Sequence, residues 1–221
     1  MSAERGTQSA ESGVTKVLVC FALEEEAKPF RRVAPANPKI KTLVTGVGKG
    51  NARRAICDAL KLEMVGLVVT CGFAGGLNPD LKMGAVVFSA GDSGLTAALQ
   101  KLGAKPVRFH CADRIATTAT EKEELWRKTG ADAVEMESQV IAAVCDEQDV
   151  RCATVRVILD TADEDLPLDF NRLSNADLSL NYGKLVLAVA RSPGKISALM
   201  RLQKNSKFAA KRLADVLAKL I

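Results

Sequence analysis

Two stretches of the chain are mostly apolar, and each ends on small or acidic residues. Residues 65–71 run into the glycine-rich segment 72–76, and residues 150–159 run into Asp160-Thr161-Ala162-Asp163. Apolar runs of this length are typical of strands that helices bury on both faces. In such α/β folds, ligands bind at the edge formed by the carboxyl ends of the strands. Asp160 is therefore a candidate functional residue.

The composition supports this fold class. The chain has 221 residues, of which 48% are hydrophobic but only 4% aromatic, so Val, Leu, Ile and Ala must supply most of the core. This length suits one substantial core. We expect a single α/β domain over residues 14–221, ending in a basic helical segment from about residue 175. Residues 1–13 are polar and are expected to form a disordered leader.

Cysteine and histidine usage argues against a disulfide framework and against a zinc site. The six cysteines are scattered through apolar segments without a C-x-x-C pair, and His110 is the only histidine. We therefore expect a cytoplasmic protein with reduced cysteines and no metal. Because no apolar run has the length of a membrane span, the chain is not expected to cross a bilayer.

The net charge of +5 is unevenly distributed. Beyond Asn181 the only acidic residue is Asp215, and the basic residues there are Lys184, Arg191, Lys195, Arg201, Lys204, Lys207, Lys211, Arg212 and Lys219. One interpretation is peripheral contact with anionic lipid at the inner face of a membrane. The other is a solvated helix face whose apolar residues pack inward, namely Leu199, Leu202, Phe208 and Leu213. A nucleic-acid partner is not expected, because few aromatic residues accompany the charges.

Turn and capping signals predict several boundaries. Residues 46–50 contain three glycines, which predicts a tight turn, and Asn51 is a suitable cap for the helix that follows. Thr120 and Glu123 have the spacing of a capping box. Residues 160–173 are acidic and interrupted by proline, which predicts a loop.

Four motifs together resemble one enzyme family. They are Glu24-Glu25-Glu26, the segment 72–76, Val134-Glu135-Met136-Glu137 and residues 157–163. In this order they resemble the nucleoside phosphorylase and nucleosidase superfamily, of purine and uridine phosphorylase type and close to methylthioadenosine/S-adenosylhomocysteine nucleosidase. The resemblance implies a three-layer α/β/α sandwich with a central mixed β-sheet, an enzyme that cleaves the N-glycosidic bond of a purine nucleoside, and a homo-oligomer.

Asp160 matches the aspartate that this superfamily places beside the purine, where it assists protonation of the ring nitrogen N7. For that role the carboxyl must hold a proton near neutral pH, which requires an apolar environment that raises its pKa. The alternative is that Asp160 only caps the turn that follows the strand.

Glu137 matches the glutamate that binds the ribose 2′ and 3′ hydroxyls, and Met136 matches the methionine beside the sugar. A carboxylate has two acceptor oxygens, which suits two adjacent hydroxyls. The alternative for Glu137 is a first-turn glutamate stabilised by the helix dipole.

Glu26 falls where hydrolytic relatives hold the attacking water, and a carboxylate there can orient the water and accept its proton. A solvated helix start is the alternative, and we prefer it for Glu24 and Glu25. The resemblance also implies that Gly72, Phe73, Ala74 and Gly75 pass under the ribose and nucleophile, where small residues allow close backbone approach. Gly48 is expected in a tight turn at the mouth of the site.

Several departures from the family pattern point to one subgroup. Phe73 and Leu159 stand where relatives commonly have serine, and the segment between Ser89 and Ala133 is short and lacks the aromatic residue that stacks on the purine. These features and the basic tail resemble the hopanoid-associated phosphorylase subgroup. By that resemblance the substrate is adenosylhopane, whose bulky apolar 5′ substituent a shortened site would accommodate.

The nucleophile is either water or phosphate. A glutamate beside the nucleophile repels an anion, so Glu26 and Phe73 favour water on physical grounds. The subgroup name implies phosphate as a co-substrate, and Lys49, Arg53 and Arg54 are available cations. We favour hydrolysis and keep phosphorolysis open, and no metal or organic cofactor is implied.

Two other functions stay open. The first is a methylthioadenosine, S-adenosylhomocysteine or futalosine nucleosidase, which acts on small soluble substrates. The second is a nucleoside-binding protein that has lost turnover, because Phe73 and Leu159 depart from the family near the expected chemistry.

Overall fold

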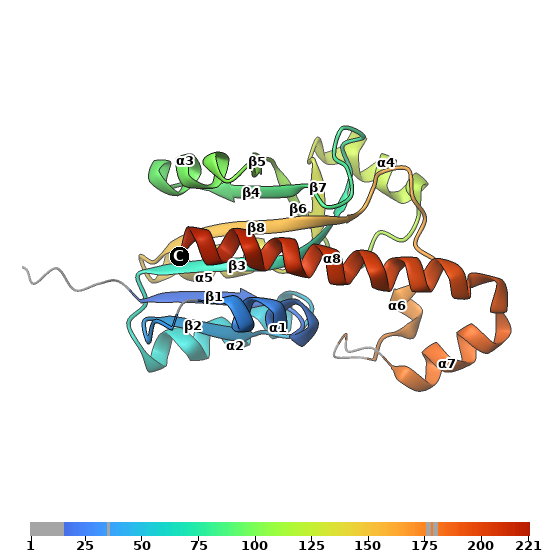
Figure 1. Ribbon diagram of the computed structural model, residues 1–221, viewed down its shortest axis with the longest axis horizontal. Coiled ribbons are helices and arrows are strands. Elements are labelled where there is room, and N and C mark those ends of the chain that lie inside the picture. The colour runs from blue at the N-terminus through green and yellow to red at the C-terminus, as the bar shows by residue number, and fades with distance from the viewer. Residues whose placement is uncertain (1–15, 35, 176–177, 179–180) are drawn as a thin grey trace, which may run out of the picture.

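The computed structural model describes residues 16–34, 36–175, 178 and 181–221. The expected leader at residues 1–13 lies outside the described residues. Figure 1 shows a central sheet with helices on both faces. Its path is β2-β1-β3-β8-β4-β5, and β7 pairs with both β3 and β6. The strands are β1 Val17–Phe21, β2 Ile40–Val44, β3 Leu67–Gly76, β4 Val86–Ala90, β5 Lys105–Pro106, β6 Phe109–Cys111, β7 Ala133–Glu135 and β8 Arg151–Asp160.

The sheet is mixed. Strand β1 is parallel to β2 and β3, and β3 is parallel to β8. Strand β4 is antiparallel to β8, and β7 is antiparallel to β3. The parallel strands β1, β3 and β8 therefore end at the same edge of the sheet, which is where the sequence predicts the site.

Helices form the outer layers. The helices are α1 Glu24–Val33, α2 Lys49–Leu62, α3 Ser93–Lys101, α4 Ala119–Thr129, α5 Ser138–Glu147, α6 Phe170–Leu173, α7 Tyr182–Arg191 and α8 Ile196–Leu220, with a 3-10 turn η1 at Pro193–Lys195. Helices α1 and α8 contact each other over one face of the sheet, and α2 contacts α5 over the other. The expected three-layer α/β/α sandwich with a central mixed sheet is confirmed.

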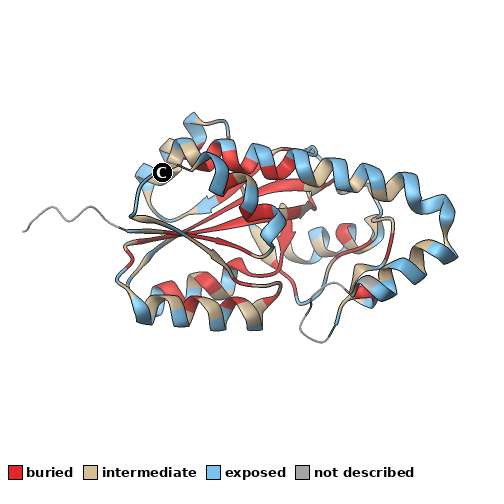
Figure 2. Cartoon of the chain, turned by 60° about the horizontal axis from the view of Figure 1, so that its bottom comes forward, coloured by how far each residue is buried: buried red, intermediate tan, exposed pale blue. Residues whose placement is uncertain are grey.

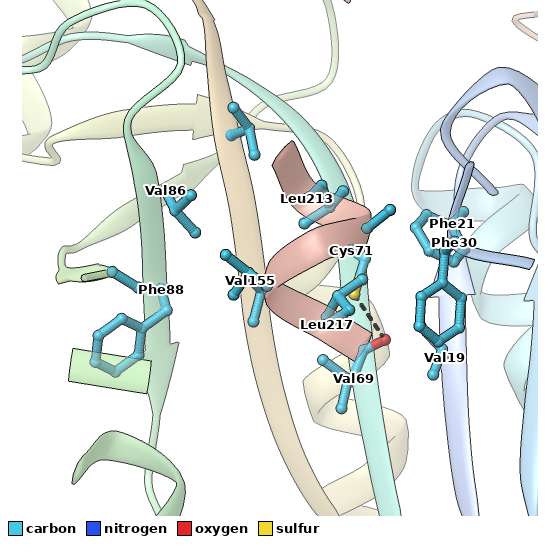
Figure 3. Packing of buried hydrophobic residues seen from close by; sticks show 14 of the residues in the cluster. Val19, Phe21, Phe30, Val69, Cys71, Val86, Phe88, Val155, Leu213 and Leu217 are labelled. Atoms are coloured by element: carbon cyan, nitrogen blue, oxygen red, sulfur yellow. Dashed lines mark hydrogen bonds between the residues drawn. The ribbon is translucent and has the colours of Figure 1, made fainter. Parts of the chain in front are cut away.

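Two hydrophobic clusters hold these layers together, one on each face of the sheet. They are separate because successive residues of a strand point to opposite faces. Val19 and Val69 point toward α1 and α8, whereas Leu18 and Val68 point toward α2 and α5. In Figure 3, Leu213 and Leu217 of α8 lie against the residues of β3 and β8 on the first face. A Val or Leu side chain buried in this way contributes about 1.5–3 kcal/mol. All six cysteines are free.

Some local boundaries differ from the sequence expectations. The helix after the glycine turn begins at Lys49 with Gly48 as its N-cap, so Asn51 lies inside it and donates to the Val47 carbonyl instead. Thr118, not Thr120, caps α4, because its hydroxyl accepts from the Glu121 backbone N–H. In both cases a neighbouring residue, Gly48 or Thr118, is the N-cap instead.

Two longer segments also differ. The glycine-rich segment 72–76 continues strand β3 rather than forming a loop, because β8 and β7 pair with it along its length. The expected loop 160–173 ends in the short helix α6, where the Asp169 side chain accepts from the Asn171 N–H. Of the residues expected to pack inward on α8, Leu213 is buried, but Phe208 is exposed.

Candidate active site

The candidate site lies at the edge where β1, β3 and β8 end. Helix α1 begins three residues after β1, and β8 ends at Asp160. The turn after β2 leads into α2, and Glu137 lies two residues after the end of β7. Four separate segments of the chain therefore deliver carboxylates or backbone N–H groups to one place, as expected for the ligand-binding edge of an α/β sheet.

Glu26 is buried at the start of α1, although acidic residues at helix starts are usually solvated. Its Oε2 accepts from the N–H groups of Ala22 and Leu23, at 3.1 and 3.0 Å, and its Oε1 accepts from the Phe73 N–H at 3.0 Å. Burial raises the pKa of Glu26 to about 7, even though Arg156 and these hydrogen bonds lower it. Near neutral pH this carboxylate can therefore both accept and release a proton.

Gly72 and Phe73 shape the surroundings of Glu26. Gly72 has φ +152°, and a Cβ added there would lie 2.7 Å from Glu26 Oε1. Only glycine allows β3 to pass so close to the carboxylate. Phe73 faces the site with its backbone N–H, whereas its ring packs against the cluster between the sheet and α8.

Glu137 is held by the glycine turn before α2. Its Oε1 accepts from the Gly48 N–H at 2.8 Å, and burial raises the pKa of its carboxyl although Arg156 lowers it. Gly48 has φ +87°, and an added Cβ would lie 2.3 Å from Leu178 Cδ1, so both backbone and space require glycine. Leu178 thus lies against the turn that positions Glu137.

Arg156 is a central residue that our sequence analysis missed. It is buried in β8, where its Nη2 donates to Glu135 Oε2 at 2.8 Å and to Thr70 Oγ1 at 3.1 Å, and lies 3.9 Å from Glu137 Oε2. An arginine in the middle of a buried apolar strand is itself a signal, because such a charge requires an acidic partner.

Glu135 is that partner and joins Arg156 to the start of α5. Its carboxylate accepts from the backbone N–H groups of Glu137 and Ser138 and from the Ser138 hydroxyl. Burial alone would raise the pKa of Glu135, but Arg156 and the Ser138 hydrogen bonds outweigh it and lower that pKa. Glu135 therefore stays ionised, and its contacts fix the backbone of Glu137.

Asp160 is buried at the end of β8 and contacts a lysine that the sequence did not single out. Lys122 of α4 is completely buried, with its Nζ 2.5 Å from Asp160 Oδ2. Burial raises the pKa of Asp160, and Lys122 counters part of that increase. Gly75 lies beside this pair, since an added Cβ would be 3.3 Å from Asp160 Oδ2.

The other predicted residues occupy the same region or its rim. Met136 is buried between β7 and α5, and Ala74 is buried in β3. Of the cations considered for phosphate, Lys49 pairs with Asp113 at 2.7 Å and Arg53 with Glu147 at 3.5 Å. Among the described residues, no group of three or more His, Cys, Asp or Glu side chains could hold a metal ion.

Known proteins resemble this chain in both sequence and fold. The family model of the phosphorylase superfamily matches residues 88–191. The 5′-methylthioadenosine/S-adenosylhomocysteine nucleosidase of Glaesserella parasuis serovar 5 (strain SH0165) is 30% identical over 196 residues, covering 73% of this chain and 82% of that protein.

Solved structures share the fold at lower identity. The futalosine hydrolase of Helicobacter pylori strain 26695 has a TM-score of 0.72 and 18% identity, covering 95% of this chain and 98% of the other. A mutant of the H. pylori 5′-methylthioadenosine nucleosidase with 5′-methylthioadenosine in its active site has a TM-score of 0.72 and 19% identity, covering 94% and 98%. With the nucleosidase match over most of both sequences, these similarities show that the chain belongs to the phosphorylase superfamily.

Proposed function

We propose that the protein releases adenine from an adenine nucleoside with a bulky apolar 5′ substituent, adenosylhopane by the sequence resemblance, and that water is the nucleophile. The similarity of this chain to known nucleosidases supports the more general part of the proposal, which is cleavage of a purine nucleoside N-glycosidic bond. The observation that favours water is the buried Glu26 carboxylate, held by three backbone N–H groups beside Glu137 and Arg156.

In the proposed reaction the bond between ribose C1′ and purine N9 breaks, and its electron pair moves to the purine. The ribose then resembles an oxocarbenium ion, and the purine accumulates negative charge. Asp160 donates a proton to N7, while Glu137 binds the ribose hydroxyls. The water oxygen bonds to C1′ as Glu26 accepts a proton from it, which yields adenine and the free sugar.

Charge at the site supports water over phosphate. An anion bound beside Glu26 would approach the carboxylates of Glu26 and Glu137, and Arg156 already binds Glu135. Two of the three cations considered for phosphate, Lys49 and Arg53, have acidic partners of their own in Asp113 and Glu147. Phosphorolysis remains the alternative that the subgroup resemblance implies.

The second candidate function has a smaller 5′ group. Similarity to 5′-methylthioadenosine/S-adenosylhomocysteine nucleosidase and to futalosine hydrolase favours those small substrates as the second candidate. An inactive nucleoside-binding protein is the candidate from another class. We also propose a cytoplasmic homo-oligomer that contacts the inner membrane face peripherally through its basic carboxyl-terminal segment. Among the described helices, none is long and apolar enough to cross a membrane.

The test is adenine release by the purified protein from adenosylhopane or a short-chain mimic, without phosphate and again with phosphate. We expect equal release in both buffers. Release only with phosphate would identify a phosphorylase and remove Glu26 from its role. Release only from methylthioadenosine, S-adenosylhomocysteine or futalosine would establish the second candidate, and binding without release would establish the inactive binder.

A further inference from the structure

Helix α7 and the first half of α8 extend beyond the hydrophobic core. Every buried residue of α8 lies at Ala209 or later, and none of residues 183–191 of α7 is buried. In Figures 1 and 2 these two helices meet at a corner that projects past the sheet and consists largely of exposed residues. We refer to residues 183–207 as the α7–α8 corner.

Part of the exposed surface of this corner is apolar. Between residues 183 and 190 the only charged or hydrogen-bonding side chain is Lys184. Val186 and Leu187 of α7 are 68% and 49% exposed, and Ile196 and Met200, one turn apart on α8, are 44% and 66% exposed. Four large apolar side chains on one projecting element exceed the scattered exposure that is normal for a protein surface.

The same corner is strongly cationic. It has no aspartate or glutamate, and its basic residues are Lys184, Arg191, Lys195, Arg201, Lys204 and Lys207. Arg201 lies 3.7 Å from Glu164, and Lys184 donates to the Ser174 carbonyl. Across the described residues, the other four form no ion pair. Their charge is available to an anionic partner.

We propose that the α7–α8 corner docks on an anionic bilayer, with Val186, Leu187, Ile196 and Met200 entering the headgroup region and the basic residues contacting lipid phosphates. Short helices with an apolar face and flanking Lys and Arg bind at this interface. A symmetric contact between two copies of the corner would bring like charges together, which disfavours self-association there.

The corner also lies at the end of the molecule toward which the strands that carry the candidate site run. Strands β1 and β3 point toward that end in Figure 1, and Leu178, just before α7, lies against Gly48 of the site. A nucleoside whose 5′ tail stays in the bilayer would therefore reach Glu137 and Glu26 from the membrane side. This direction of entry rests on the proposed function, whereas lipid binding by the corner does not.

The test is cosedimentation of the full chain with vesicles of phosphatidylcholine alone or mixed with phosphatidylglycerol. We expect binding only to the mixed vesicles, weakened by salt, and weakened about tenfold or more by Val186→Asp with Met200→Asp and by Lys195→Glu with Lys204→Glu. The matched control is Leu62→Asp with Met64→Asp, because these residues are 87% and 93% exposed away from the corner. The control should bind like the parent protein.

Three outcomes would overturn the inference. They are equal binding to both vesicle types, unchanged binding by the corner variants, and a change of oligomer mass in those variants, which would make the corner a contact between subunits. All variants should still release adenine from a soluble short-chain substrate, since none alters a site residue. If the parent protein releases adenine but does not bind the mixed vesicles, only the membrane inference fails. If the parent protein binds the mixed vesicles but no protein releases adenine, only the proposed function fails.

Discussion

Lys122 and Asp160 form a buried ion pair that joins α4 to the end of β8, with Lys122 Nζ 2.5 Å from Asp160 Oδ2. The same ammonium donates to the carbonyls of Thr161 and Glu164, each at 2.7 Å. All three of its hydrogens therefore have acceptors, and the turn after Asp160 is attached to a helix far away in sequence. Lys122 therefore positions Asp160, and its positive charge counters part of the rise in the pKa of Asp160 that burial causes.

Replacing Lys122 with Met should lower the free energy of unfolding by about 3–5 kcal/mol, because it leaves the buried Asp160 carboxylate and two carbonyls without their donor. Urea denaturation measures this change. Lys128→Met, an exposed site on the same helix, is the control and should cost less than about 0.5 kcal/mol. Equal effects of the two substitutions would show that the pair does not stabilise the fold.

Asp160→Asn should reduce kcat by about 10²–10⁴-fold, because an amide cannot supply the proton that the departing purine needs. Asp163→Asn, three residues later and exposed, should leave kcat nearly unchanged. Steady-state adenine release at a temperature where circular dichroism shows both variants folded is the measurement. A kcat close to that of the parent protein would remove Asp160 from the role of acid.

Glu26→Gln should abolish hydrolysis, and the parent enzyme should lose activity as the pH falls through about 7, the value to which burial raises the pKa of Glu26. A water-activating base must be deprotonated, so the acidic limb of the pH–rate profile reports this group. Glu25→Gln, an exposed neighbour, should keep the parent profile. An acidic limb that persists near pH 7 in an active Glu26→Gln variant would contradict the assignment.

The raised pKa of Glu26 also makes the free energy of unfolding depend on pH. Glu26 has its pKa raised from 4.5 to about 7, so between these values the folded state holds a proton that the unfolded state releases. Stability from this group falls as the pH rises through that window, by up to about 1.4 kcal/mol per pH unit. The unfolding free energy of the parent protein minus that of Glu26→Gln should therefore decrease over this range, and a constant difference would mean that the pKa is not raised.

Glu137→Gln should raise KM about tenfold or more, because a charged acceptor for the ribose hydroxyls becomes a neutral one. The Gly48 N–H can still donate to the amide oxygen, so the turn before α2 should keep its place. Substrate titration of adenine release measures the effect. A parent-like KM together with a parent-like kcat would argue against the ribose-binding role.

The fold class and the segments that reach the candidate site could be predicted from the amino-acid sequence. Apolar runs such as the one before Asp160 form strands because they can be buried on both faces, and this property depends only on local composition. The family motifs then indicated Glu26, Glu137 and Asp160. All three side chains are buried beside backbone N–H groups or a lysine, and their catalytic and binding roles stay predictions.

Which charged side chains pair with one another depends on how the chain folds. Lys122 and Arg156 are buried because partners from distant segments neutralise them, and no periodicity in one sequence reveals such pairing. Strand pairing likewise extended β3 through the glycines at 72–76, against their low strand propensity, because β7 and β8 supply its hydrogen bonds. Local residues determine which elements form, whereas burial and long-range contacts decide which polar groups can be enclosed together.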